Sequence, residues 1–157
     1  MIQQIIRTMF SLAFLAVATG TLAQDKKANN IDDSSIALQG YSPVSYLDLG
    51  LAQKGKSQFK STYDKVHYYF TSADQKKKFD SDPEKYLPQY GGFCAFGVYA
   101  GAKFRPDPNK FITKDEKYFL FLNNLELDAK QLWLAEDKHE KLVMKADANW
   151  EKLREKE

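Results

Sequence analysis

Alternating apolar and polar residues mark two short stretches of the chain, and each stretch predicts a β-hairpin. In the first hairpin Val66, Tyr68 and Phe70 share one face, while His67 and Tyr69 share the other. We therefore expect a small antiparallel sheet with one face in the core. The paired segments and their polar turns are 59–63, Asp64-Lys65 and 66–70, and then 111–113, 114–117 and 118–122.

Two short helices are predicted after the first hairpin. Ser72 begins the first, because its hydroxyl can accept a backbone hydrogen bond three residues on while the Gln75 side chain reaches back. Pro83 opens the second, where its missing N–H costs nothing, and the glycines at 91–92 end it. This order places Cys94 just beyond a helix end, in a segment with little side-chain cover.

The tail from about 128 to 155 is predicted to form one long helix. Apolar residues at helical spacing give it a stripe that packs on the sheet. The fold class is therefore α+β, a small antiparallel sheet of hairpins covered by two short helices and a long C-terminal helix. No internal repeat and no second domain is evident, so one domain is expected over 36–157. The stripe consists of Leu142, Ala146, Trp150 and Leu153.

The first 23 residues have the layout of a cleaved secretory signal. Arg7 supplies the positive start, 9–18 is an apolar run, and 21–23 carries small residues at the positions that a signal peptidase reads. The apolar run is shorter than the ~20 residues that span a bilayer. We expect an exported protein, periplasmic or extracellular, with a flexible leader over 24–35 and no stable membrane anchor after cleavage.

Charge and motifs exclude several classes of function. The chain has 23 Lys and Arg against 21 Asp and Glu, so it carries no electrostatic footprint for nucleic acid or anionic membrane. No catalytic triad order, zinc-protease helix, phosphate loop or dinucleotide fingerprint occurs. We expect a non-enzymatic protein, and nothing in the residues identifies a protein partner. Cys94 is the single cysteine, so no internal disulfide can form.

An aromatic stretch at 66–72, followed by 82–86 and 89–94, resembles the YHS domain, a small module often found beside metal-transport proteins. Further segments resemble a secreted branch of this family. Together they cover the chain from about Ala37 to Leu153, so the resemblance extends over the whole predicted domain. These segments are Gly40 to Val44, Pro88 to Ala95 and Lys145 to Trp150.

Metal-binding members of the family carry cysteines where this chain has Ser45, Thr71 and Gln75. Hydroxyl and amide groups are poor ligands for copper or zinc, so the usual metal site is not expected. The resemblance implies instead that Cys94 binds a transition metal, copper most plausibly or zinc, or a small metal complex. His67 is the second candidate ligand, although an exposed strand residue is the simpler interpretation.

Two other hypotheses remain open for Cys94. A thiol-dependent oxidoreductase would oxidise it to a sulfenic acid and reduce it with an external thiol. In a structural or interaction module it would be an inert core residue. His139 is expected on a solvated helix face. The aromatic residues are expected in the core or in a pocket around Cys94. The predicted pocket residues are Tyr41, Tyr69, Tyr90 and Phe93, and by resemblance alone Lys103, Asp107, Asn149 and Trp150.

Overall fold

The computed structural model describes residues 28–136 and 138–156. It contains two hairpins and several helices, which confirms the predicted α+β class. In chain order the elements are η1 (Leu38–Gly40), η2 (Ser45–Leu49), β1 (Lys56–Tyr63), β2 (Val66–Phe70), α2 (Ala73–Ser81), η3 (Glu84–Tyr86), η4 (Gln89–Gly92), α3 (Ala95–Ala100), β3 (Asp107–Lys114), β4 (Lys117–Phe121), α4 (Ala129–Ala135) and α5 (His139–Leu153).

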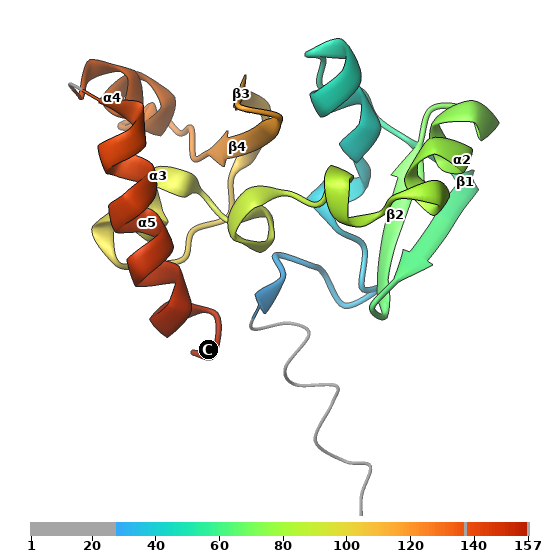
Figure 1. The fold of residues 1–157 in the computed structure, drawn as a ribbon, viewed down its shortest axis with the longest axis horizontal. Coiled ribbons are helices and arrows are strands. Elements are labelled where there is room, and N and C mark those ends of the chain that lie inside the picture. Colours follow the sequence, from blue (N-terminus) through green and yellow to red (C-terminus); the bar gives the residue numbers. More distant parts are fainter. Residues whose placement is uncertain (1–27, 137, 157) are drawn as a thin grey trace, which may run out of the picture.

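The hairpins lie in two lobes. Figure 1 shows β1, β2 and α2 in one lobe, and β3 and β4 with α3, α4 and α5 in the other. Each hairpin is a separate two-stranded antiparallel sheet, so the single sheet expected from the sequence is not formed. The strand pairing was predicted correctly in both, with Val66, Tyr68 and Phe70 all buried on one face.

Strand β4 joins the hydrophobic cores of the two lobes. Tyr118 and Leu120 belong to the cluster of the first lobe, while Phe119 and Phe121 belong to the cluster of the second. All four side chains are at most 2% exposed. A continuous apolar run is the pattern of a strand buried on both faces, because alternate side chains point to opposite sides. The two cores therefore share one strand.

The two hairpins are built in the same way. Lys56–Phe70 and Asp107–Phe121 align without a gap, and each contains a bulge after its first residue pair. Each turns through two residues with positive φ, which is the geometry of a tight hairpin turn that matches the strand twist. The turn residues are Asp64 and Lys65 in one, and Asp115 and Glu116 in the other.

The same correspondence extends to the turn before each hairpin. The φ angles of Leu38, Gln39 and Gly40 are 54°, 53° and 78°, and those of Tyr90, Gly91 and Gly92 are 54°, 58° and 82°. A short helix follows each turn and ends at a left-handed glycine, and a further helix follows each hairpin. The chain thus contains two copies of one motif. We call 38–81 the first unit and 90–135 the second unit.

The expectation that the chain has no internal repeat is therefore wrong. Across the aligned hairpins only Thr62, Asp64 and Phe70 meet an identical residue in the second unit. The repeat lies in backbone conformation, which many sequences can specify when turn residues and buried positions are retained. Sequence identity at so few positions gives no detectable signal.

The predicted second helix is also corrected. Residues 84–86 and 89–92 form two short 3₁₀ turns, η3 and η4, separated by Pro88. The residue before a proline is driven out of the helical region, and Leu87 accordingly has a ψ of 140°. Cys94 lies just past η4, as predicted, but it also caps a helix that was not predicted, α3.

The C-terminal helix breaks into α4 and α5. Trp133 on α4 and Leu142 on α5 both belong to the second hydrophobic cluster. They are nine residues apart, about two and a half turns of a regular helix, so an unbroken helix would point them to opposite sides. The extended backbone of Glu136 and Lys138 interrupts the helix and lets both side chains face the core.

Residues 28–35 bond to both units, so the flexible leader predicted over 24–35 is corrected for them. The Ser35 carbonyl accepts the His67 N–H of the first unit at 2.8 Å. Asn30 donates its backbone N–H to one carbonyl of η4 at 2.8 Å and its side-chain amide to another at 3.1 Å. The predicted signal at 1–23 and the leader at 24–27 lie outside the described residues. No helix in the described part of the chain is long and apolar enough to cross a membrane.

Candidate functional site around Cys94

Cys94 lies at the start of α3 and is 1% exposed. Its sulfur accepts the backbone N–H groups of Gly97 and Leu122, at N–S distances of 3.4 and 3.2 Å. Its own N–H donates to the Phe104 carbonyl at 2.9 Å. A buried N–H without an acceptor is costly, so even the weak acceptor sulfur contributes here. Cys94 therefore ties α3 to the end of β4, and the open segment expected around it is buried.

Ser42 occupies the position of Cys94 in the first unit. Its hydroxyl oxygen accepts the N–H of Ser45 at 3.4 Å, as the sulfur accepts that of Gly97. Its N–H donates to the Gln53 carbonyl at 2.9 Å, in the place of the bond from Cys94 to Phe104. A hydroxyl and a thiol thus hold the same place in two copies of one backbone motif.

Ser45, Thr71 and Gln75, the positions at which metal-binding YHS domains carry cysteines, lie together in the first unit. Gln75 donates its side-chain N–H to Ser45 Oγ at 2.9 Å, and its Oε1 accepts the Thr71 N–H at 3.1 Å. The same oxygen accepts the Ser42 hydroxyl at 2.8 Å, and the Ser45 hydroxyl donates to Gln53 at 2.8 Å. Each of these groups is hydrogen bonded within the cluster, which is a polar network rather than a set of metal ligands.

Five of the predicted pocket residues come together in the second lobe. The Trp150 ring lies 6.0 Å from that of Tyr90 and 6.1 Å from that of Phe93. The Lys103 ammonium lies 5.4 Å from the centre of the Phe93 ring. Asn149 donates to two carbonyls of α3, at 3.0 and 2.9 Å. These residues join α5 to η4 and α3.

Tyr90 also provides a polar contact within this group. Its hydroxyl donates to Asp147 Oδ1 at 3.0 Å, while its ring is buried in the second cluster. Burial, followed by the nearby Asp147 charge and this hydrogen bond, raises the pKa of Tyr90 far above that of an ordinary tyrosine. Tyr90 therefore remains a neutral donor and contributes no acid–base chemistry near neutral pH.

The other three predicted pocket residues lie elsewhere. Tyr41 pairs with Lys54 across a β-bridge, and the Lys54 ammonium lies 5.1 Å from its ring centre. Tyr69 lies on β2 in the first lobe. Asp107 begins β3, where its carboxylate accepts the Asn109 N–H at 2.9 Å. The predicted pocket is therefore divided between two lobes.

His67 lies on β2, while Cys94 starts α3 in the other lobe. The ring Nδ1 of His67 is 2.9 Å from the Thr62 hydroxyl on the paired strand, and its backbone bridges to Ile36. No contact joins His67 to Cys94 among the described residues. Within 28–136 and 138–156, no group of three or more His, Cys, Asp and Glu side chains is arranged to hold a metal ion.

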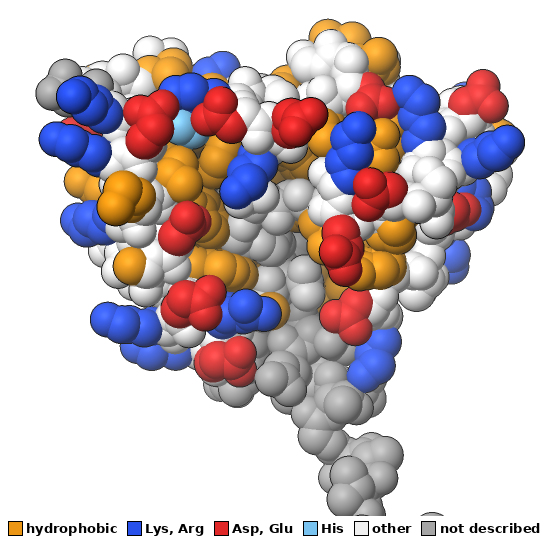
Figure 2. Space-filling model, in the orientation of Figure 1, with side chains coloured by type: hydrophobic (Ala, Val, Ile, Leu, Met, Phe, Trp, Pro, Cys, Tyr) orange, Lys and Arg blue, Asp and Glu red, His pale blue; other side chains and the backbone are white. Residues whose placement is uncertain are grey.

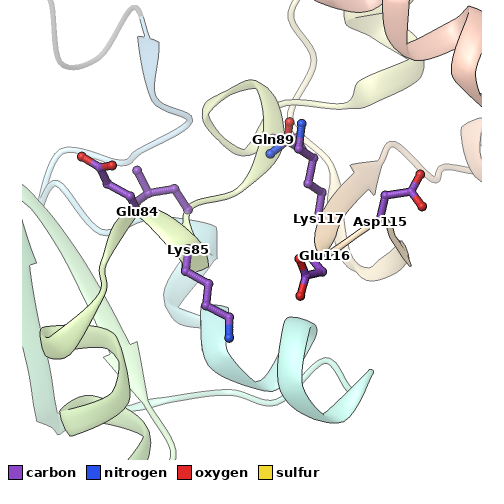
Figure 3. Close-up of a pocket in the computed structure, with 7 residues that line it drawn as sticks. Glu84, Lys85, Gln89, Asp115, Glu116 and Lys117 are labelled. Atoms are coloured by element: carbon purple, nitrogen blue, oxygen red, sulfur yellow. The ribbon is translucent and has the colours of Figure 1, made fainter.

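A pocket of about 440 Å³ opens where the segment joining the units meets the β3–β4 turn. Figure 3 shows that its side chains come from these two segments. The charged ones are all exposed and carry both signs. The same mixture of charges covers the visible face of the molecule, without a large patch of one sign (Figure 2). The lining residues are Glu84, Lys85, Leu87, Gln89, Asp115, Glu116 and Lys117.

The surroundings of His139 also differ from the prediction. It was expected on a solvated face, yet its Nδ1 accepts the indole N–H of Trp133 at 3.0 Å. Its ring packs edge-on against Phe119, with centroids 5.1 Å apart. Burial and the nearby Lys114 charge lower the pKa of His139. An aromatic residue six positions before a histidine at a helix break was the only sequence signal.

Comparison with known proteins adds no relative. No family model matches the chain, and neither does any curated protein or any solved structure. The resemblance to the YHS domain therefore remains a hypothesis, and function has to be inferred from the residues and their geometry.

Proposed function

We propose that the protein is an exported, non-enzymatic structural or interaction module in which Cys94 maintains the fold and does not react. The observation that carries this proposal is the equivalence of Cys94 and Ser42. One copy of the motif uses a hydroxyl and the other a thiol to accept the same backbone hydrogen bond, from the N–H three residues on. Because the Ser42 hydroxyl accepts the equivalent bond in the first unit, the Cys94 sulfur serves here as a hydrogen-bond acceptor that holds the fold.

The surroundings of the sulfur agree with a structural role. In the first unit the Thr71 N–H and the Ser42 hydroxyl both donate to Gln75 Oε1, so an amide oxygen lies between them. In the second unit the Leu122 N–H bonds to Cys94 directly. A sulfur is larger than a hydroxyl oxygen, so it spans this distance without an intervening amide. The Cys94 sulfur thus lies in the space that the Gln75 side chain occupies in the first unit, and it accepts the equivalent backbone N–H.

Substitution of Cys94 tests this role. Cys94→Ala removes the acceptor for two N–H groups and is expected to lower the free energy of unfolding by about 1–3 kcal/mol. Cys94→Ser keeps an acceptor and should cost about 1 kcal/mol less than Cys94→Ala. Urea unfolding of both variants measures the difference, with Ser42→Ala as the matched change in the first unit. A serine variant less stable than the alanine variant would contradict the role of the sulfur as an acceptor.

Alkylation in the native state tests whether the thiol reacts. A 1% exposed side chain should react with iodoacetamide far more slowly than free cysteine, and the rate should rise on unfolding. Mass spectrometry of the labelled protein follows the reaction. Native labelling as fast as that of free cysteine would refute the proposal and favour the thiol-dependent oxidoreductase.

Metal handling through Cys94, with copper the most plausible ion, is a second candidate function. It is favoured by the two N–H groups that converge on the sulfur, since such hydrogen bonds commonly surround metal-bound thiolates. A reducing, anaerobic titration with copper(I) and with zinc, beside Cys94→Ser, separates the two candidates. Tight one-to-one binding that is lost in the variant would establish the metal role. No thiol-dependent binding of either ion would reject it for those ions.

A further inference from the structure

We propose that His139 and Trp133 form an acid-sensitive latch that holds the start of α5 against α4 and the second sheet. This inference is independent of the role of Cys94. It rests on one hydrogen bond, from the indole N–H of Trp133 to Nδ1 of His139 at 3.0 Å, and on the packing around it. An indole N–H is only a donor, so this bond requires an unprotonated Nδ1.

The latch lies between buried aromatic rings. Trp133 is 1% exposed and packs against Phe119 and Phe121, with ring centroids 6.1 and 5.6 Å away. The His139 ring lies 5.6 Å from that of Trp133 and is only partly buried. Solvent protons can therefore reach the imidazole, while the indole N–H that depends on it lies in the core.

Protonation of His139 would break this bond. A proton on Nδ1 turns the acceptor into a donor that faces another donor, and the indole N–H loses its partner inside the core. The new charge would also lie at the first residue of α5, where the helix dipole disfavours cations. Acid should therefore separate the histidine from the indole.

The charged groups around His139 have opposing effects. Lys114, on β3, disfavours the imidazolium, while Glu140 on α5 and Asp115 in the β3–β4 turn favour it. Lys114 and Glu140 also pair directly at 2.7 Å, which partly neutralises both. Phe119 on β4 and Trp133 on α4 contact His139 through uncharged aromatic rings. Burial is the largest influence, and it favours the neutral form.

The remainder of α5 is held by other contacts. Asp147 accepts the Tyr90 hydroxyl, and Asn149 donates to two carbonyls of α3. Leu142 and Ala146 lie in the second cluster. These contacts belong to the middle and end of the helix, whereas the latch holds its first residue. Opening should therefore release the α4–α5 junction and leave the C-terminal part of α5 in place.

The sign of the pH effect follows from linkage. The folded protein keeps His139 neutral at a pH where the unfolded chain already binds a proton, because its folded pKa is lowered. The stabilising contribution is complete above the ordinary histidine pKa of about 6.5 and is lost as the pH falls below it. Acid weakens the junction, and alkali has no effect through this group.

Nitrogen-15 NMR of the full protein tests the latch between pH 7.5 and 5. At pH 7.5 the His139 ring should be the neutral tautomer with its proton on Nε2. As the pH falls below about 6.5, the Trp133 indole N–H signal should shift in step with His139 protonation, and that of Trp150 should not. A His139 proton on Nδ1 at pH 7.5, or a Trp133 signal that does not move, would overturn the proposal.

His139→Gln provides the matched control. Glutamine offers an oxygen acceptor that does not titrate in this range, so the Trp133 signal should become independent of pH. His67→Gln removes the histidine of the other lobe and should leave the Trp133 titration unchanged. If the Trp133 signal titrates equally in His139→Gln, its pH dependence arises elsewhere and the latch is refuted. The wild-type titration tests the proposal even if a variant fails to fold.

Discussion

Trp133→Ala is expected to lower the free energy of unfolding by about 3–5 kcal/mol, the usual cost of emptying a large aromatic site in a core. The residue is 1% exposed and is one of the largest fully buried side chains. Its ring packs against Tyr99, Phe119 and Phe121, which come from α3 and β4. Removal would leave a cavity at the point where α3, α4, α5 and the second sheet meet.

The substitution should destabilise both lobes. β4 contributes Phe119 to the cluster of Trp133 and Tyr118 to the cluster of the first lobe. The Tyr118 ring also stacks on that of Tyr46, with centroids 5.0 Å apart. Because one strand serves both cores, we expect a single cooperative transition at a lower denaturant concentration instead of separate unfolding of the second lobe.

Urea unfolding followed by circular dichroism and by fluorescence measures the effect. Leu134→Ala is the matched control, since this neighbour on α4 is 56% exposed and should cost less than about 0.5 kcal/mol. Trp133→Phe keeps a ring but removes the indole donor, so its cost should lie between the two. Two separate transitions in Trp133→Ala would show that the lobes are not coupled through β4.

Local sequence signals were sufficient for the hairpins. A polar pair between alternating segments predicts a tight turn, and Asp64 and Lys65 form it with positive φ at both residues. Ser72 was likewise identified as a helix cap, and its hydroxyl accepts the Gln75 N–H at 3.3 Å. The Gln75 side chain reaches back as predicted, but it accepts the N–H of Thr71, one residue before the cap, at 3.1 Å. It also bonds to Ser42 and Ser45, which are distant in sequence.

The missed features depend on contacts between distant segments. Cys94 follows two glycines, which suggests exposure, yet the side chain is buried. Its sulfur accepts the Leu122 N–H, and its backbone N–H donates to the Phe104 carbonyl. The equivalence with Ser42 was invisible because the repeated turn is encoded by different residues, Leu38 and Gln39 in one unit and Tyr90 and Gly91 in the other. Residue resemblance found the aromatic group around Trp150, but it could not separate this group from Tyr41 and Tyr69.

Gly55→Ala is expected to be the second most damaging single change considered, at about 3 kcal/mol, the upper end for overpacked sites. A Cβ atom on Gly55 would lie 2.5 Å from the carbonyl carbon of Tyr69 and 2.7 Å from the backbone nitrogen of Phe70. Both contacts are with backbone, which cannot rotate away. The methyl group would push the start of β1 from the end of β2, next to the bulge in the first hairpin.

The same displacement would weaken the turn before the hairpin, because the Gly55 N–H donates to the Gly40 carbonyl at 2.8 Å. Gly50→Ala is the control. Its Cβ meets nothing within 4 Å, but its φ of +63° makes alanine cost about 1 kcal/mol through the backbone alone. Chemical denaturation compares the two, and amide NMR shifts in β1 and β2 locate the change. Equal costs, with no shifts confined to the hairpin, would indicate that β1 and β2 are less closely packed than the structure requires.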